Sequence, residues 1–226
     1  MSVSIEKKRI LYAAVFPLLF IILLWVIQLL QWGMDWNFSF LGIYPQMLKG
    51  VPGIFLNCFI HSGFDHLWSN TLSLFTLLWF LFYFYSQIVW KTLGYLWILT
   101  GLFLWLIGRP GVHVGASGIV YGLTFFLFFS GVLRQYAPLM AVSLVVVFLY
   151  GSIIWGMFPF AERIKPDMSW EGHLSGAVSG TFVAVLLRKQ GPQKPPPVEE
   201  KEEDEQDDDD PYWLQGTGSY PLPPQG

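Results

Sequence analysis

Charged residues and cysteines are both scarce in this sequence. Only 13% of its 226 residues are charged, whereas 54% are hydrophobic and 18% are aromatic. Soluble domains carry about 25% charged residues, so the composition excludes an ordinary soluble domain and indicates a membrane protein. Cys58 is the single cysteine, and one thiol forms neither an internal disulfide, nor a structural zinc site, nor a redox pair. Cysteine chemistry therefore gives no candidate site.

A cleavage site for a secretory signal is also absent. Lys7, Lys8 and Arg9 precede an apolar run that continues to about Leu30. At roughly 20 residues this run can span a bilayer, whereas a secretory signal is usually shorter and ends in small residues. We therefore expect a retained first helix.

Long hydrophobic runs recur along the chain. Each suits one transmembrane helix of about 20 residues, and they lie near 10–31, 66–87, 88–108, 115–134, 138–158 and 170–188. The sequence therefore predicts an all-α membrane protein with six transmembrane helices and both ends on one side. Residues 32–65, rich in aromatic and turn-forming residues, are expected to form a long first loop with structure of its own.

Basic residues orient these helices. With the amino end inside, seven basic residues would face the cytoplasm and four the outside, which agrees with the positive-inside rule. The seven are Lys7, Lys8, Arg9, Lys91, Arg134, Arg188 and Lys189, and the four are Lys49, Arg109, Arg163 and Lys165. We expect both termini in the cytoplasm and the first loop outside.

The last part of the chain differs abruptly in composition. Residues 191–226 hold 2 basic and 10 acidic groups, a formal charge of −8, together with several prolines. Such a segment cannot bury enough apolar surface to offset the entropy of ordering. The prediction is a membrane domain over residues 1–190 and a disordered acidic and proline-rich cytoplasmic tail over residues 191–226.

Four polar side chains stand at the starts of the even-numbered spans. His66 and Asn70 lie one turn apart in the second run, Ser117 opens the fourth, and His173 opens the sixth. These spans run from outside to inside, so all four residues are expected at one level near the outer surface. Polar groups within a membrane are costly and tend to be functional, and a reaction centre requires such convergence.

Ser117 and His173 form a candidate nucleophile and general base. A serine hydroxyl is a weak nucleophile until a base takes its proton, and histidine is the usual base. The donors available to an oxyanion are Asn70, His66 and the backbone N–H of Ser117. Glu171 lies about 200° around the helix from His173, so we predict a dyad without a carboxylate.

Each of the four also has a purely structural interpretation. Ser117 could belong to a small-residue helix contact, and His173 could be a buried histidine that donates to a backbone carbonyl. His66 and Asn70 could cap the second helix. Independent coincidences would then have to place all four at one depth, so the catalytic interpretation is favoured.

Glycine pairs explain how the nucleophile and base could meet. Gly118 and Gly122 lie one turn apart in the fourth span, as Gly176 and Gly180 do in the sixth. Small residues with this spacing let helices in a membrane approach closely. We expect the fourth and sixth helices to pack together near Gly118 and Gly176.

Three motifs resemble those of the rhomboid intramembrane serine proteases, and the resemblance covers about residues 45–188. "HSGFDHLWSN" looks like the family segment that ends in His-x-x-x-Asn, "GASGIVYG" like its Gly-x-Ser-Gly box, and "GHLSGAVSG" like its final His-x-x-Gly-x-x-x-Gly helix. By position, the resemblance implies that Ser117 is the nucleophile, His173 the base, and His66 and Asn70 the oxyanion partners. It also implies that Tyr121 is an aromatic that packs on the base and that Gly115 lets the substrate backbone approach.

The resemblance also implies a fold, an activity and a set of partners. It implies a six-helix rhomboid-like bundle that cleaves transmembrane segments of single-span membrane proteins with a Ser-His dyad. The partners would be those substrates and the lipid bilayer, without a metal, a cofactor or nucleic acid, in the inner membrane of a bacterium. The sequence departs from many members in lacking an obvious Trp-Arg pair in the first long loop, which leaves the conformation of that loop open.

Three other functions compete with the protease. A catalytically inactive rhomboid-like protein that binds membrane clients would generally lack the serine or the histidine, and both are present. A zinc enzyme could use the four histidines, all on the outer side, but no His-Glu-x-x-His motif occurs. A transporter is opposed by the absence of an internal repeat.

Overall fold

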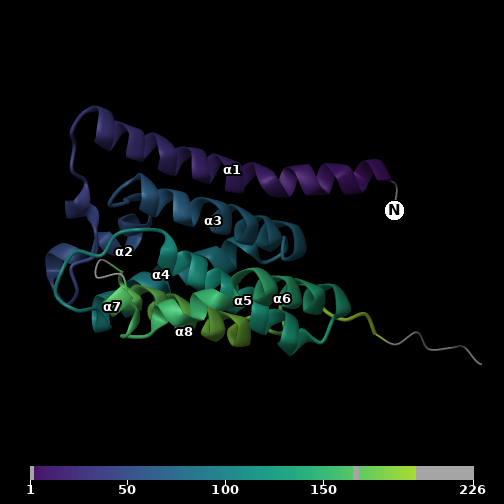
Figure 1. Cartoon of the computed structure of the whole chain (residues 1–226). Coiled ribbons are helices and arrows are strands. Elements are labelled where there is room, and N and C mark those ends of the chain that lie inside the picture. Colours follow the sequence, from purple (N-terminus) through teal and green to yellow (C-terminus); the bar gives the residue numbers. More distant parts are fainter. Residues whose placement is uncertain (1–2, 165–167, 197–226) are drawn as a thin grey trace, which may run out of the picture. The chain divides into compact units, whose positions relative to one another are not determined.

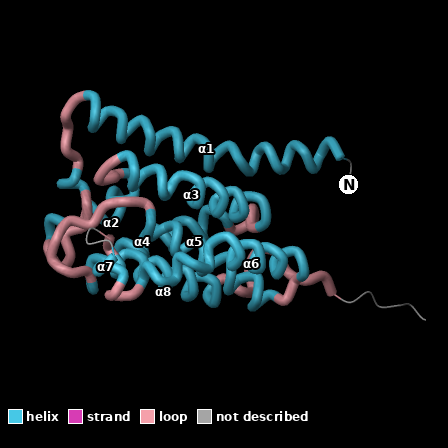
Figure 2. Tube along the Cα trace, in the orientation of Figure 1, coloured by secondary structure: helices cyan, strands magenta, loops and turns pink. Residues whose placement is uncertain are grey.

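The protein is helical throughout the part that the structure describes. The structure is a computed structural model that describes residues 3–164 and 168–196, and in these ranges it has no strand (Figures 1 and 2). The long helices are α1 (Val3–Gly33), α3 (Phe64–Phe84), α4 (Val89–Ile107), α5 (Ser117–Arg134), α6 (Ala137–Tyr150) and α8 (Trp170–Leu186). The short helices are η1 (Ser39–Leu41), η2 (Leu48–Gly50), α2 (Gly53–Leu56), η3 (Asn57–Phe59), η4 (Gly151–Met157) and α7 (Ala161–Ile164). The predicted all-α class is confirmed.

Five helical segments of the described chain are long and apolar enough to cross a membrane. They are α1, α3, α4, α5 and the continuous segment of α6 with η4. Large apolar side chains are widely exposed on them, such as Leu11 at 67% and Phe148 at 88%, as expected of helices that face lipid. The sixth predicted span corresponds to α8, which at 17 residues is shorter than the other five.

Two predicted boundaries differ from the structure. The first helix begins at Val3 rather than near residue 10, because hydropathy marks the lipid-buried part of a helix and not its polar end. The fifth run was expected to be helical to residue 158, yet α6 ends at Tyr150 and η4 continues to Met157. Glycine and serine at 151 and 152 are weak helix formers. The Tyr121 hydroxyl also donates to the carbonyl of Ile153.

The backbones of α5 and α8 almost touch. A Cβ atom on Gly176 would overlap the carbonyl oxygen of Gly118, and one on Gly180 would overlap the carbonyl oxygen of Gly122. α8 also packs against α4 and η4. The two glycine pairs found in the sequence therefore lie at the α5–α8 contact.

Both ends of α8 are capped by polar side chains. At the amino end, Ser169 accepts the backbone N–H of Gly172 at 3.1 Å, as an N-cap residue does. At the other end, the buried Arg134 of α5 donates to carbonyls of the turn that follows α8. These are the carbonyls of Leu187, Arg188 and Gln190, at 2.8–3.1 Å.

The first loop has structure of its own, as predicted, and it rests on α4. The indole of Trp97 donates to the carbonyl of Phe55, and that of Trp105 donates to the carbonyl of Met47, both at 3.0 Å. α1 packs chiefly against α3, where Trp25 donates to the hydroxyl of Thr71 at 3.1 Å (Figure 1). The loop is therefore anchored on α4.

The tail predicted over residues 191–226 lies mostly outside the described residues. Residues 1–194 form one compact unit, and the structure describes nothing beyond residue 196. Gln193 still contacts the end of α8, because its amide donates to the carbonyl of Arg188 at 3.2 Å. The disorder of the tail stays a prediction.

Candidate active site

Ser117 is the first residue of α5 and follows a non-helical segment from α4. In that segment Gly115 has φ of +118°, a conformation that L side chains rarely adopt. A Cβ atom on Gly115 would also lie 2.5 Å from Cε1 of His66. Glycine is thus required both for the turn into α5 and for the approach of the His66 ring. The first N–H groups of a helix lack intrahelical partners, so donors and a positive dipole end surround Ser117.

His173 is held by two contacts in the first turns of α8. Its Nδ1 lies 2.9 Å from the carbonyl oxygen of Gly156, and its ring stacks on Tyr121 with centroids 4.2 Å apart and planes 6° apart. A carbonyl oxygen only accepts, so Nδ1 carries the proton of the neutral ring and Nε2 carries the lone pair. The ring is therefore fixed in the tautomer in which Nε2 is the base.

The first turns of α5 and α8 lie against each other. A Cβ atom on Gly118 would lie 3.2 Å from the carbonyl oxygen of Gly172. The chain neighbours of Ser117 and His173 are thus in contact. In the described residues the hydrogen bond of the His173 ring goes to Gly156 and not to Ser117, and catalytic hydrogen bonds often form fully only with substrate bound.

The other two predicted residues lie in the first turns of α3. His66 faces Gly115, and its Nδ1 lies 3.2 Å from the hydroxyl of Ser62. Asn70 is buried, and its amide nitrogen donates to the carbonyl of His66 at 3.1 Å. The structure thus brings His66 to the segment before Ser117, while one N–H of Asn70 is used within its own helix. An amide carries a second N–H donor.

His61 has a role that the sequence does not reveal. It is buried, its Nε2 accepts the backbone N–H of Ala116 at 3.4 Å, and its ring contacts that of His66 with centroids 5.1 Å apart. Burial, followed by the charge of His66, lowers the pKa of His61 to about 3. A neutral His61 therefore acts as an acceptor that holds the backbone directly before Ser117.

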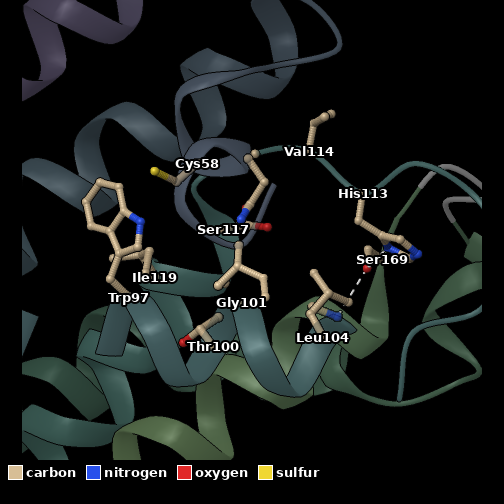
Figure 3. Close-up of a pocket in the computed structure, with 15 residues that line it drawn as sticks. Cys58, Trp97, Thr100, Gly101, Leu104, His113, Val114, Ser117, Ile119 and Ser169 are labelled. Carbon is tan, nitrogen blue, oxygen red and sulfur yellow. Dashed lines mark hydrogen bonds between the residues drawn. The ribbon is translucent and has the colours of Figure 1, made fainter. Parts of the chain in front are cut away.

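A small cavity lies beside Ser117 (Figure 3). Its volume is about 20 Å³, which holds about one water molecule. Besides Ser117, its lining includes Thr100, His113 and Ser169. The hydroxyl of Thr100 is buried and has no protein partner among the described residues. The cavity therefore offers a water molecule polar contacts next to the serine.

Two polar contacts join the segment before Ser117 to the start of α8. His113 Nδ1 lies 2.7 Å from the hydroxyl of Ser169, and the Arg109 side chain lies 3.6 Å from the buried carboxylate of Glu171. A serine followed by an acidic residue in the first helical turn is an N-cap pattern, so the sequence contains a signal for Ser169. Its pairing with His113 depends on tertiary structure. Both ring nitrogens of His113 have protein partners, which disfavours a metal-ligand role.

The described helices, with their exposed apolar surfaces, define a multi-pass integral membrane protein. The family model of the Rhomboid domain matches residues 49–190. The chain therefore belongs to the rhomboid family, and the resemblance inferred from the three motifs is confirmed.

Similar proteins occur in mycobacteria. An uncharacterized protein of Mycobacterium bovis is 36% identical over 178 residues, which cover 75% of this chain and 73% of the relative. An uncharacterized protein of Mycobacterium tuberculosis matches with the same values. One of Mycobacterium leprae is 31% identical over 191 residues, covering 80% of this chain and 74% of the relative. These names state no activity.

Proposed function

We propose that the protein is an intramembrane serine endopeptidase that cleaves transmembrane segments of single-span membrane proteins. The observation that carries the proposal is the fixed tautomer and orientation of the His173 ring. The carbonyl of Gly156 accepts the proton of Nδ1, and the ring of Tyr121 fixes the plane of the imidazole. The basic Nε2 therefore belongs to a fixed imidazole on α8, which packs against α5, the helix that carries Ser117. Membership of the rhomboid family supports the same assignment.

The proposed reaction proceeds by acyl transfer. Ser117 Oγ attacks the scissile carbonyl carbon while its proton passes to Nε2 of His173. The oxyanion that forms accepts hydrogen bonds from the backbone N–H of Ser117 and from His66 and Asn70. His173 then gives its proton to the leaving amine, and water, deprotonated by the same base, hydrolyses the acyl-serine.

The dyad works without a carboxylate because neutral groups orient the base. In a Ser-His-Asp triad the aspartate fixes the tautomer and the direction of the imidazole. Here the Gly156 carbonyl and the Tyr121 ring take over that role. Glu171, the nearest acidic residue in sequence, pairs with Arg109 instead.

Water and an unwound substrate are both needed for hydrolysis in a bilayer. The cavity beside Ser117 has room for about one water molecule. A substrate helix hides its carbonyl groups in internal hydrogen bonds, so the cleaved bond must lie in a locally extended segment. We place the site near the outer surface of a bacterial cytoplasmic membrane, with both termini in the cytoplasm, and assign no metal or cofactor to it.

The test compares the purified protein with its Ser117→Ala and His173→Ala variants. Each is incubated in detergent with a single-span substrate and, separately, with a fluorophosphonate probe that labels activated serines. We expect the wild type to cleave the substrate and to react with the probe, and Ser117→Ala to do neither. Cleavage by Ser117→Ala at the wild-type rate would contradict the nucleophile assignment. A wild type that neither cleaves nor labels would favour the inactive, client-binding alternative.

A further inference from the structure

A hydrogen bond joins the residue four positions before the proposed nucleophile to the residue four positions before the proposed base. His113 precedes Ser117, and Ser169 precedes His173. Nδ1 of His113 lies 2.7 Å from Oγ of Ser169, although the two residues are 56 positions apart in the sequence. Figure 3 shows these two side chains next to each other at the wall of the cavity that Ser117 also lines.

The direction of each hydrogen bond follows from the partners. Nε2 of His113 lies 3.0 Å from the carbonyl oxygen of Arg109, which only accepts, so Nε2 carries the proton of the neutral ring. Nδ1 then accepts the hydroxyl proton of Ser169. The same hydroxyl oxygen accepts the backbone N–H of Gly172 at 3.1 Å. Every polar atom of this chain of bonds is therefore satisfied when His113 is neutral.

Ser169 also fixes the backbone at His173. Its carbonyl oxygen accepts the backbone N–H of His173 at 3.2 Å. Ser169 thus bonds two successive N–H groups of the first turn of α8 while it is bonded to His113. A displacement of the His113 side chain would therefore displace Ser169 and, with it, the first turn of α8, which carries His173.

The backbone of the segment before Ser117 is hydrogen-bonded to the first loop and not to α8. His113 exchanges both backbone bonds with Ile43 at 2.9 Å, and the N–H of Gly115 donates to the carbonyl of Asn57 at 2.9 Å. These bonds tie the segment to the first loop. The segment contacts the start of α8 through the side chains of His113 and Arg109. The guanidinium of Arg109 also donates to the carbonyl of Met168 at 2.9 Å.

We propose that His113 and Ser169 are positioning residues that align His173 with Ser117. The inference rests on the proposed function, because it concerns the geometry of that dyad. Neither residue contacts the reacting atoms. Their bond fixes the distance between two short stretches of chain that end at the nucleophile and at the base, and about 1 Å of misplacement can lower a rate about 100-fold.

The test uses the full-length protein and variants that remove or keep the bond. His113→Phe removes the ring nitrogens but leaves the Ser169 cap on α8, and His113→Asn keeps a polar atom near the place of Nδ1. Ser169→Ala removes the hydroxyl and Ser169→Thr keeps it. Thr181→Ala is the matched control, because it deletes a hydroxyl of the same helix whose bond, to the carbonyl of Ala177 at 2.9 Å, stays within α8.

Four quantities are measured well below the melting temperature of each variant. They are kcat and KM for a single-span substrate, the rate of fluorophosphonate labelling of Ser117, and amide hydrogen exchange in residues 170–176. We expect His113→Phe and Ser169→Ala to lower kcat and labelling roughly 10- to 100-fold with KM within about twofold. His113→Asn and Ser169→Thr should recover most of the loss, and the double variant should be no worse than the poorer single one.

Hydrogen exchange separates this inference from the proposed function. His113→Phe should speed exchange at residues 170–176, which lie on a different element, whether or not the protein cleaves anything. Unchanged exchange in that variant would overturn the inference, as would faster exchange in an active enzyme with unchanged kcat. A wild type that does not label at Ser117 would instead contradict the proposed function, and with it the positioning role.

Discussion

Among single residues, Tyr121 restrains the proposed base by stacking rather than by charge. Its ring lies against His173, and its hydroxyl separately bonds the carbonyl of Ile153. Tyr121→Phe keeps the stack and loses the hydroxyl, so we expect a loss of about 1 kcal/mol in stability and kcat within a few-fold. Tyr121→Leu loses the stack and should lower kcat about 10- to 100-fold. Full kcat in Tyr121→Leu, measured with a single-span substrate, would show that stacking does not orient the base.

His61 links stability to pH. Burial lowers its pKa from 6.5 to about 3 in the folded protein, so between these values the unfolded chain binds more protons than the native one. The free energy of unfolding must therefore fall as pH drops from about 6.5 toward 3. His61→Gln retains an acceptor for the N–H of Ala116 without titrating. Its melting temperature should decline less steeply than that of the wild type between pH 7 and 4.5, and parallel curves would refute the assignment.

The two side chains proposed as oxyanion donors belong to α3, and their loss should slow the reaction without affecting the fold greatly. We expect His66→Ala and Asn70→Ala each to reduce kcat about 10- to 1,000-fold, because one such donor contributes a few kcal/mol. The double variant should be slower still. Unaltered kcat in both single variants would remove these residues from the site, and their melting temperatures would identify any unfolded preparation.

Between elements, the α5–α8 contact sets how far the nucleophile is from the base. We expect Gly118→Val and Gly176→Val to abolish cleavage and lower the melting temperature, because a side chain at Gly176 would overlap the carbonyl oxygen of Gly118. Gly94→Val is the matched control, since a Cβ atom on this α4 glycine meets nothing within 4 Å. Gly131 is unsuitable as a control, because a Cβ atom there would overlap Ser143 and Leu139 of α6. Normal cleavage by Gly118→Val would mean that the contact does not align the dyad.

The sequence predicts the helices better than the contacts between them. Span lengths follow from bilayer thickness, so four of the six predicted runs match helices closely at both ends, and the site residues lie in the first turns of α3, α5 and α8 as predicted. Gly151 and Ser152 give a weak sequence signal for the early end of α6, but the bond from Tyr121 to the carbonyl of Ile153 is a tertiary contact that the sequence does not reveal. The bond between His113 and Ser169 was missed for the same reason.

For the whole molecule, the convergence of the site depends on the topology of the chain. We expect a cysteine at position 40, where Phe40 is 63% exposed in the first loop, to react with an impermeant thiol reagent from outside sealed cells. A cysteine at position 205, which lies outside the described residues, should react after the cells are opened. Cys58 is 2% exposed and should contribute little background. Reaction of both positions from the same side would contradict the topology.

The close packing of α8 has a consequence for how the protein is made. α8 carries glycine at positions 176 and 180, which face α5 rather than lipid. Small and polar residues contribute little to partitioning into a bilayer. α8 is also the last long helix of the described chain to leave the ribosome, when α4 and α5 have already been synthesised. We therefore expect the entry of α8 into the membrane to depend on helices already there, and the site to be complete only once α8 has inserted.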